Sequence, residues 1–369
     1  MPDPTPRLLM LGQINHIHVA HMANQLSLRG FEVILAGMRR PGYGATPETL
    51  PTIEVEELPF ASGSTPAGVL SQIRAIRRLL AKHRPDVVQA HWLCGYGAFA
   101  AIAGARPLAS VAWGSDVLRA SRIQRLANRI ALRRSALATG DSLDLCEAMI
   151  ALGADRAKVA HVTWGVDLTR FSPIADRGEA RRLLGLPDTR LVLSPRSLLP
   201  IYNPDVVLTA FDLLADRLPD VGLVLLSLYE TEPDLSTVRH RDRVHVVGHV
   251  PYEQMPEYLR AADACVSIPS SDASPRTVWE AMACGTPVVL SDLPWVDHEL
   301  DRDRDALVVP IEPGAVAAAL GELLERSDRA RALAASALAR TAATRDVRVE
   351  MDRLAALLRS TLRPSRGSS

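Results

Sequence analysis

The chain has 369 residues, 47% of them hydrophobic, and it carries 42 Lys+Arg and 42 Asp+Glu, so its formal net charge is zero. This length favours about two domains, each with a substantial hydrophobic core. A neutral chain argues against a general nucleic-acid-binding protein, and we expect no nucleic acid among its partners. The charge is unevenly placed: residues 1–170 carry 19 basic and 13 acidic residues, so the remainder is acidic.

Short apolar runs alternate with helical patterns along the whole chain, as in parallel sheets that are covered by helices on both faces. In the first half we expect strands from Arg7, Phe31, Asp86, Leu108, Ala136 and Lys158, with helices near 18–29, 67–83, 97–105, 119–134 and 142–152. The pattern restarts with strands from Arg190, Val221, Arg243, Ala264, Pro287 and Ala306, with helices near 203–217, 254–262, 275–284 and 313–325, and a helical segment at 328–361. The sequence therefore predicts an α/β chain with two doubly wound parallel-sheet domains.

The domain boundary falls in the sequence W-G-V-D that starts at Trp164, where Gly165 suits a sharp turn. We expect an N-terminal domain at 1–164, a C-terminal domain at 165–345, and a final helix with a tail at 346–369.

Cysteine usage and hydropathy bear on the compartment. The four cysteines lie far apart in the sequence and form no C-x-x-C motif, which favours reduced thiols and a cytoplasmic protein. The N-terminal PDPTPR is polar and leads directly into a strand, unlike a signal peptide. No uncharged apolar run reaches about 18 residues, so we expect no transmembrane helix.

The predicted helix from Arg119 to Arg134 contains six arginines and no acidic residue. Two interpretations stay open. The arginines form a solvated helix face, or they contact an anionic acceptor or the anionic inner face of a membrane.

Residues 271–289, SDASPRTVWEAMACGTPVV, place two carboxylates, Asp272 and Glu280, eight residues apart between two predicted strands. A loop that leads into a helix start can present backbone N–H groups to a phosphorylated ligand. Ala273 and Ser274 offer such groups, whereas Pro275 has none to donate.

Other candidate residues follow predicted strands, and open parallel sheets bind ligands beyond the carboxyl ends of their strands. Arg196 follows the strand RLVLS, where a cation suits a diphosphate, although a local acid is an alternative partner. His91 ends the strand DVVQAH and is either a ligand contact or a satisfied structural histidine. Trp113-Gly114-Ser115-Asp116 ends the next strand, with Asp116 either an N-cap or a functional acid.

The first strand is followed by Gly12, which allows close backbone approach, but not by G-x-G-x-x-G, so a nicotinamide cofactor has little support. His16, His18 and His21 are close in sequence, yet their spacing is a weak metal signal. We expect no metal site.

The order of these motifs resembles the group 1 glycosyltransferases, a large family of retaining enzymes that use nucleotide sugars. Asp272-x7-Glu280 resembles their E-x7-E signature, with Asp in place of the first Glu, and W-G-S-D and W-G-V-D match two further family patterns. The resemblance covers roughly residues 7–345. It implies the GT-B fold, in which two Rossmann-like domains face each other across a cleft.

By this resemblance Glu280 holds the donor ribose, Asp272 and His91 lie beside the donor sugar, and Arg196 neutralises the diphosphate. The remaining donor-site candidates are Gly12, His249, Val250, Ser274, Arg276 and Thr277. The acceptor-side candidates in the N-terminal domain are His18, Trp113, Ser115 and Asp116. Tyr202-Asn203 stand near the position of a usual family lysine, and Glu299 is a frequent family acid without an assigned role.

The resemblance implies transfer of a sugar from a nucleoside diphosphate sugar, UDP-linked, to a hydroxyl or amine. The nucleotide sugar is then a co-substrate, and no further cofactor is expected. The acceptor stays open between a glycan, a lipid-linked sugar and a small metabolite, with peripheral membrane contact as an option. Two alternatives remain: a non-catalytic sugar-nucleotide or glycan-binding protein of the same fold, which the missing lysine favours, and a nucleotide-sugar epimerase.

Overall fold

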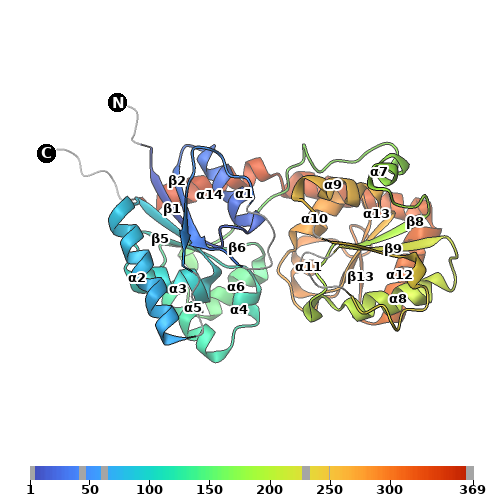
Figure 1. The fold of residues 1–369 in the computed structure, drawn as a ribbon, viewed down its shortest axis with the longest axis horizontal. Coiled ribbons are helices and arrows are strands. Elements are labelled where there is room, and N and C mark those ends of the chain that lie inside the picture. The colour runs from blue at the N-terminus through green and yellow to red at the C-terminus, as the bar shows by residue number, and fades with distance from the viewer. Residues whose placement is uncertain (1–4, 41–46, 60–64, 227–232, 249, 363–369) are drawn as a thin grey trace. The chain divides into compact units, whose positions relative to one another are not determined.

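The computed structural model describes residues 5–40, 47–59, 65–226, 233–248 and 250–362. The chain folds into two compact units (Figure 1). The first unit combines residues 1–164 with the C-terminal residues 349–369, and the second consists of residues 165–348.

The first unit is built on a seven-stranded parallel sheet with the order β3-β2-β1-β4-β5-β6-β7. Its strands are β1 (Arg7–Leu11), β2 (Glu32–Met38), β3 (Glu54–Leu58), β4 (Val87–His91), β5 (Leu108–Val111), β6 (Leu137–Gly140) and β7 (Val159–His161). The strand order reverses between β1 and β4, which are hydrogen-bonded neighbours. The carboxyl ends of these two strands therefore border the topological switch point, where such sheets bind ligands.

Helices lie on both sides of this sheet (Figure 1). They are α1 (Ile17–Ser27), α2 (Pro66–His83), α3 (Ala98–Ala103), α4 (Ser115–Leu118), α5 (Arg122–Arg134), α6 (Leu143–Ala151) and α14 (Val347–Ser360), with a π-helical turn η1 (Trp92–Gly97) and a 3₁₀ turn η2 (Arg156–Lys158). Ile73, Ile76 and Leu79 lie on one face of α2 and pack onto the sheet. Their spacing of three is that of an amphipathic helix.

The second unit has a six-stranded parallel sheet with the order β10-β9-β8-β11-β12-β13. Its strands are β8 (Arg190–Ser194), β9 (Val221–Leu226), β10 (Val244–Val247), β11 (Ala264–Ser267), β12 (Val288–Ser291) and β13 (Leu307–Val309). Its helices are α7 (Arg177–Leu184), α8 (Pro204–Ala215), α9 (Met255–Ala261), α10 (Arg276–Ala283), α11 (Pro294–Glu299), α12 (Pro313–Glu325) and α13 (Ser327–Thr344), with 3₁₀ turns η3 (Pro200–Tyr202), η4 (Arg241–Arg243) and η5 (Tyr252–Gln254).

Both faces of the second sheet are buried. Leu191 and Leu193 of β8 join one hydrophobic core, and Val192 between them joins the core on the opposite face. Successive side chains of a strand point to opposite faces, so a strand buried on both sides reads as a continuous apolar run. This is why the sequence pattern predicted these strands, and the fold class is confirmed.

The sequence pattern missed β3, α7 and α11. β3 has the sequence EVEEL and lies at the edge of its sheet, where charged side chains remain solvated. The expected helical segment 328–361 forms two helices, because the helical conformation is interrupted between Thr344 and Val347. No described helix is long and apolar enough to cross a membrane.

The chain enters and leaves the second unit at one place. The Val166 N–H donates to the Arg345 carbonyl at 2.6 Å, and the Val347 N–H donates to the Val166 carbonyl at 3.0 Å. Gly165 has a φ of +69°, and a Cβ on it would lie 2.4 Å from the Val347 Cα. Only glycine fits this close approach of two backbone segments.

We expect Gly165→Ala to destabilise the second unit more than Gly185→Ala does. Gly185 has a similar φ of +64° but open space around it, so its substitution costs only the left-handed strain, about 1–2 kcal/mol. At Gly165 the clash with Val347 adds to this strain. Urea unfolding midpoints of the two variants would measure the difference, and equal midpoints would contradict the close contact.

Candidate active site

Arg196 and Asp272 meet at the switch point of the second sheet. The strand order reverses between β8 and β11, which are hydrogen-bonded neighbours. Arg196 follows the carboxyl end of β8, and Asp272 lies in the loop after β11. Arg196 Nη2 is 2.5 Å from Asp272 Oδ2, and both side chains are mostly buried. The topology therefore joins the two residues in an ion pair where parallel sheets bind ligands.

Two further contacts fix the Arg196 guanidinium. Its Nη1 donates to Thr277 Oγ1 at 2.9 Å, and its Cζ lies 4.4 Å from the centre of the Tyr202 ring. A guanidinium over an aromatic face is attracted by the ring. Tyr202, near the position of the usual family lysine, thus supports the neighbouring arginine instead of supplying a second charge.

Asn203 joins the loop after β8 to the loop after β11. Its Nδ2 donates to the Ile268 carbonyl at 2.7 Å and lies 2.9 Å from Ser270 Oγ. Its backbone is left-handed, with φ 49°, a conformation that asparagine tolerates better than most residues. No sequence pattern predicts this contact, because Asn203 and Ile268 lie 65 positions apart in the chain.

Glu280 lies inside α10 and is only 1% exposed. Its Oε1 accepts from the Tyr252 hydroxyl at 2.6 Å and is 2.9 Å from Arg276 Nε, and Arg276 Nη2 is 2.6 Å from the same hydroxyl. Burial raises the pKa of Glu280, and Arg276 and Tyr252 oppose that rise. A ribose would have to displace the Tyr252 hydroxyl or bind the second carboxylate oxygen.

Ser274 and Glu299 belong to a buried network that shapes the loop after β11. The Ser274 hydroxyl donates to Glu299 Oε2 at 2.5 Å and accepts from Trp279 Nε1 at 2.9 Å. Arg345 Nη2 is 2.6 Å from Glu299 Oε2, and its Cζ lies 3.9 Å from the Trp279 ring centre. Ser274 has φ 55°, so this network holds the loop in a strained conformation. Glu299 is thus a structural acid that Arg345 neutralises.

The start of α10 is the remaining feature near Arg196. No side chain caps this helix within the described structure, and Pro275 occupies its N-cap position. A helix start carries partial positive charge and can bind an anion. Of the expected donor-site residues, Val250 packs its side chain into the hydrophobic core. His249 lies outside the described residues.

In the first unit, Gly12 and His91 follow the two strands at the switch point. A Cβ on Gly12 would lie 2.9 Å from Val19 and 3.5 Å from His91 Cδ2, so the glycine allows close packing there. His91 Nδ1 accepts from Trp113 Nε1 at 3.2 Å, which places the ring proton on Nε2. His91 is 2% exposed, and Nε2 has no hydrogen-bond partner among the described residues. A buried donor of this kind suits a ligand oxygen.

Aromatic rings gather around Trp113. The His16 ring centre is 4.7 Å from that of Trp113, the Trp164 centre is 4.6 Å away, and the His18 ring lies 5.1 Å from Trp164. His16 Nδ1 also accepts from the His18 backbone N–H and caps α1. His16 and His18 thus take part in ring packing and helix capping, and we assign them no metal.

The residue after His91, Trp92, has a φ of 68° and begins the π-helical turn η1. A bulky residue rarely adopts this left-handed conformation, and both strain and π-helical turns collect at functional sites. Nothing in the sequence indicated either feature.

Asp116 is not the N-cap of α4. Gly114, with φ 91°, takes that position, and Asp116 lies in the first turn. Its carboxylate accepts from the backbone N–H groups of Trp113 at 2.9 Å and Leu93 at 2.7 Å, and burial raises its pKa to about 6. Of the two alternatives, the structure excludes the N-cap, because the Asp116 side chain joins the loops after β4 and β5. The neighbouring Ser115 is exposed.

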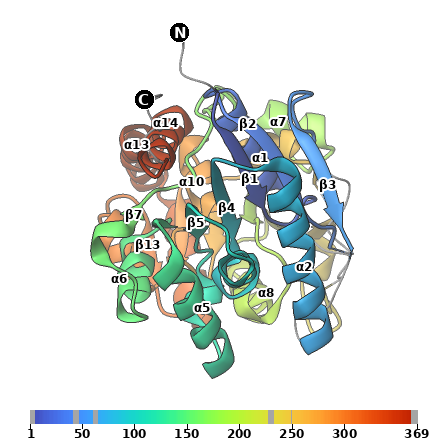
Figure 2. The ribbon, with the colours of Figure 1, turned by 90° about the vertical axis from the view of Figure 1, so that its left-hand side faces the viewer.

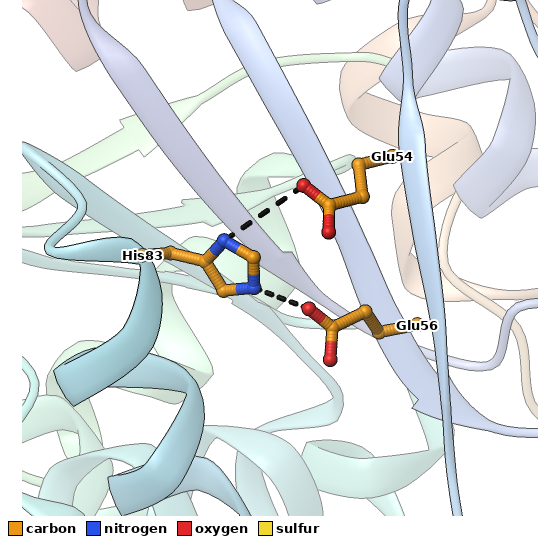
Figure 3. Close-up of side chains that lie close together, drawn as sticks. All are labelled: Glu54, Glu56 and His83. Carbon is orange, nitrogen blue, oxygen red and sulfur yellow. Dashed lines mark hydrogen bonds and ion pairs between the residues drawn. The ribbon is translucent and has the colours of Figure 1, made fainter.

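Among the residues that the structure describes, one group of side chains could hold a metal ion. Glu54 and Glu56 of β3 point toward His83 at the end of α2 (Figure 3). The ammonium of Lys82, however, lies 2.5 Å from Glu56 and 3.4 Å from Glu54, so it already pairs with both carboxylates and offsets one of their two negative charges. We interpret the group as an ion-pair network at the sheet edge, remote in topology from either switch point.

Both halves of the chain match sequence models of glycosyltransferases. Residues 176–340 match the family described as glycosyl transferases group 1, and residues 7–142 match the family described as glycosyl transferase 4-like. The chain belongs to the group 1 glycosyltransferases. This membership accounts for the shared order of motifs at the carboxyl ends of the strands.

Two relatives are named D-inositol 3-phosphate glycosyltransferase. The one from Actinosynnema mirum is 34% identical over 64% of this chain and 62% of its own length, and the one from Streptomyces scabiei is 26% identical over 88% and 81%. This chain thus spans less than two thirds of the first relative. The crystal structure of Anabaena HepE in complex with UDP-glucose has a TM-score of 0.79 at 19% identity, over 96% of this chain and all of that one. This likeness shows the GT-B fold.

We expect the stability contribution of His91 to depend on pH. Desolvation by burial lowers its pKa from 6.5 to about 3, with a smaller effect from His16. The folded state therefore keeps His91 neutral while the unfolded state binds a proton, so its contribution is present above pH 6.5 and is lost as the pH falls toward 3. Between pH 7 and pH 5 the loss is about 2 kcal/mol.

Melting temperatures of the wild type and His91→Gln would measure this effect. The advantage of the wild type over the variant should shrink on acidification from pH 7 to 5 and stay constant from pH 7 to 8. Taking the difference between the two melting temperatures at each pH cancels the contribution of other titrating groups, such as Asp116, that both proteins share. A constant difference over the whole range would contradict the buried neutral histidine.

Proposed function

We propose that this protein is a retaining glycosyltransferase that moves a sugar from a UDP-linked donor to a hydroxyl or amine acceptor. The observation that carries the proposal is the Arg196–Asp272 pair at the switch point of the second sheet, beside the start of α10. There a fixed cation, a carboxylate and a helix N-terminus come together, which is what a sugar diphosphate requires. The names of the relatives and the UDP-glucose complex of Anabaena HepE lend support.

The ion pair provides a simple way to bind the diphosphate. Without ligand, Asp272 neutralises Arg196, so the mostly buried guanidinium is not left unpaired. A phosphate oxygen can take over that contact while Thr277 and Tyr202 hold the guanidinium in place. Asp272 is then left beside the sugar, where its charge stabilises the positive charge that develops at the anomeric carbon.

The transfer step needs little from protein side chains beyond charge and position. The bond from the anomeric carbon to the diphosphate oxygen breaks, and a bond to the acceptor oxygen or nitrogen forms on the same face of the sugar. The departing diphosphate takes the acceptor proton, so we assign no general base. Arg196 and the α10 start neutralise the leaving group, with the nucleotide sugar as sole co-substrate and no metal in the proposal.

The nucleoside and the acceptor use other residues. Glu280, held by Tyr252 and Arg276, is proposed to accept the ribose hydroxyls. In the first unit the His91 Nε2–H can donate to a sugar or acceptor hydroxyl, and His18, Trp113 and Ser115 remain acceptor-side candidates. Asp116 is reassigned to positioning, because its carboxylate is occupied by backbone N–H groups. The acceptor class stays open between a glycan, a lipid-linked sugar and a small metabolite.

We also propose that the protein works in the cytoplasm. All four cysteines are free thiols, and Cys146, Cys265 and Cys284 are buried. Burial raises the pKa of Cys265 and Cys284 to about 12, so neither is a reactive thiolate. Such cysteines fit a reducing compartment.

A nucleotide-sugar epimerase and a non-catalytic binding protein are the competing functions. The argument for a binding protein was the missing lysine. Tyr202 and Asn203, which stand near its position, instead contact Arg196 and the loop after β11. Incubation with UDP-sugars and a panel of acceptors separates the three. A transferase makes glycosylated acceptor, an epimerase changes the donor without an acceptor, and a binding protein does neither.

We expect Arg196→Ala to lower turnover about 100-fold, because the leaving group loses its main positive charge. Arg190→Ala is the matched control, since Arg190 begins the same strand and forms a half-exposed ion pair with Asp220. The control should keep the wild-type rate. Release of UDP from a UDP-sugar donor would measure both, and a wild-type rate in Arg196→Ala would remove Arg196 from the site.

We expect Glu280→Gln to weaken UDP binding by about tenfold or more, since an amide accepts the ribose hydroxyls less well than a carboxylate. Glu257→Gln, which changes an acid paired with Arg260 on α9, should leave the affinity unchanged. Calorimetric titration with UDP gives both values, with melting temperatures to confirm folding. An unchanged affinity in folded Glu280→Gln would contradict the ribose role.

A further inference from the structure

One surface of the first unit is strongly basic and takes no part in the proposed chemistry. Residues 66–134 contain twelve Lys and Arg but only two acids, Asp86 and Asp116. Asp116 is buried, and Asp86 Oδ2 accepts the backbone N–H of Arg7. Neither acid offsets the arginines that this stretch exposes.

Three helices bring these arginines to one side of the sheet. α3 packs against both α2 and α5, and the three lie together in both views (Figures 1 and 2). Arg77 of α2 and Arg134 of α5 reach over the end of α3, where they donate to the carbonyls of Ile102 and Ala101. The outer faces of α2 and α5 therefore form one continuous surface, which we call the α2–α3–α5 face.

On α5 the charges form a stripe. Arg122, Arg125, Arg129 and Arg133 are spaced by three, four and four residues and are all exposed. Residues at this spacing are neighbours on a helix, and like charges there weaken it. None of the four forms an ion pair within the part of the chain that the structure describes, whereas surface arginines of the second unit such as Arg217 do. An external anion would offset this repulsion.

Large aliphatic side chains lie beside the arginines. Ile123 is 83% exposed and Leu126 59%, and Leu118 just before α5 is also exposed. Exposed aliphatic groups among arginines are typical of helices that rest in the interface of a membrane. The phosphates of a nucleic acid could contact the arginines, but a nucleic acid offers no apolar region in which Ile123 and Leu126 would be buried.

We propose that the α2–α3–α5 face docks on a bilayer that contains anionic lipids. The arginines of α5 contact lipid phosphates, and Ile123 and Leu126 enter the boundary between headgroups and acyl chains. Each arginine near such a surface contributes roughly a fivefold change in affinity. Docking does not depend on the proposed transfer reaction, so each can fail without the other.

The test is flotation of the full chain with vesicles of phosphatidylcholine, with and without about 30% phosphatidylglycerol. We expect binding only to the anionic vesicles, and its loss when salt rises from about 50 mM to about 500 mM. Absence of flotation with anionic vesicles at low salt would overturn the proposal. So would binding of a labelled DNA duplex without flotation, which would assign the face to nucleic acid.

Variants locate the contact. Arg122→Ala, Arg129→Ala and Arg133→Ala together should lower vesicle affinity about 100-fold, and alanine keeps the helix intact. Arg182→Ala, Arg217→Ala and Arg331→Ala together remove the same charge from exposed sites in the second unit and should change little. Equal losses in the two triple variants would overturn the proposal. UDP affinity, measured by calorimetry, should be the same in both and reports on the proposed function separately.

Discussion

Charged side chains that are buried in the second unit are paired with side chains of opposite charge, and the Arg196–Asp272 pair shows this constraint most clearly. Two neighbouring parallel strands end side by side, so their loops must hold polar groups against an apolar sheet. An unpaired guanidinium there would be costly, which explains its carboxylate, hydroxyl and aromatic partners. Glu280 with Arg276, and Glu299 with Arg345, follow the same rule. These ion pairs balance the charges of the buried side chains in the structure without ligand. Under the proposed function, a diphosphate binds by replacing Asp272 as the partner of Arg196.

The sequence predicted the architecture because parallel strands leave an unambiguous pattern. β8 reads as an unbroken apolar run since both of its faces are buried, whereas β3, with three glutamates at a sheet edge, does not. The sequence made Arg196, Gly12 and His91 candidates because they end or follow such runs, and it made Asp272 a candidate by its spacing to Glu280. Tyr202, Trp279 and Arg345 were missed, since their roles depend on contacts that only the folded chain creates. The sequence left Asp116 open between an N-cap and a functional acid for the same reason: its partner Leu93 lies 23 residues away.

The switch point of the first unit differs from that of the second in the kind of side chain that it holds. It has the imidazoles of His91 and His16, several indole rings and the buried carboxyl group of Asp116. The low pKa of His91, about 3, and of His16, about 4, keeps both imidazoles neutral. Burial is the main cause in both cases. Such surroundings suit neutral hydroxyl-bearing groups, while the arginines of the second unit suit a diphosphate. The proposed division, with the diphosphate in the second unit and the acceptor in the first, is consistent with this difference in charge.

The pairing of Val166 with Arg345 and Val347 has a consequence for the modular history of the protein. The second unit is one uninterrupted length of chain whose two ends are hydrogen-bonded to each other, while the first unit is made of two separate pieces. In topological terms the second unit is a domain inserted into the first. Because its two ends are adjacent, such a domain can be gained, lost or replaced without disrupting the fold of the first unit. Exchange of the whole second unit would therefore require only two adjacent chain junctions and would leave both pieces of the first unit intact.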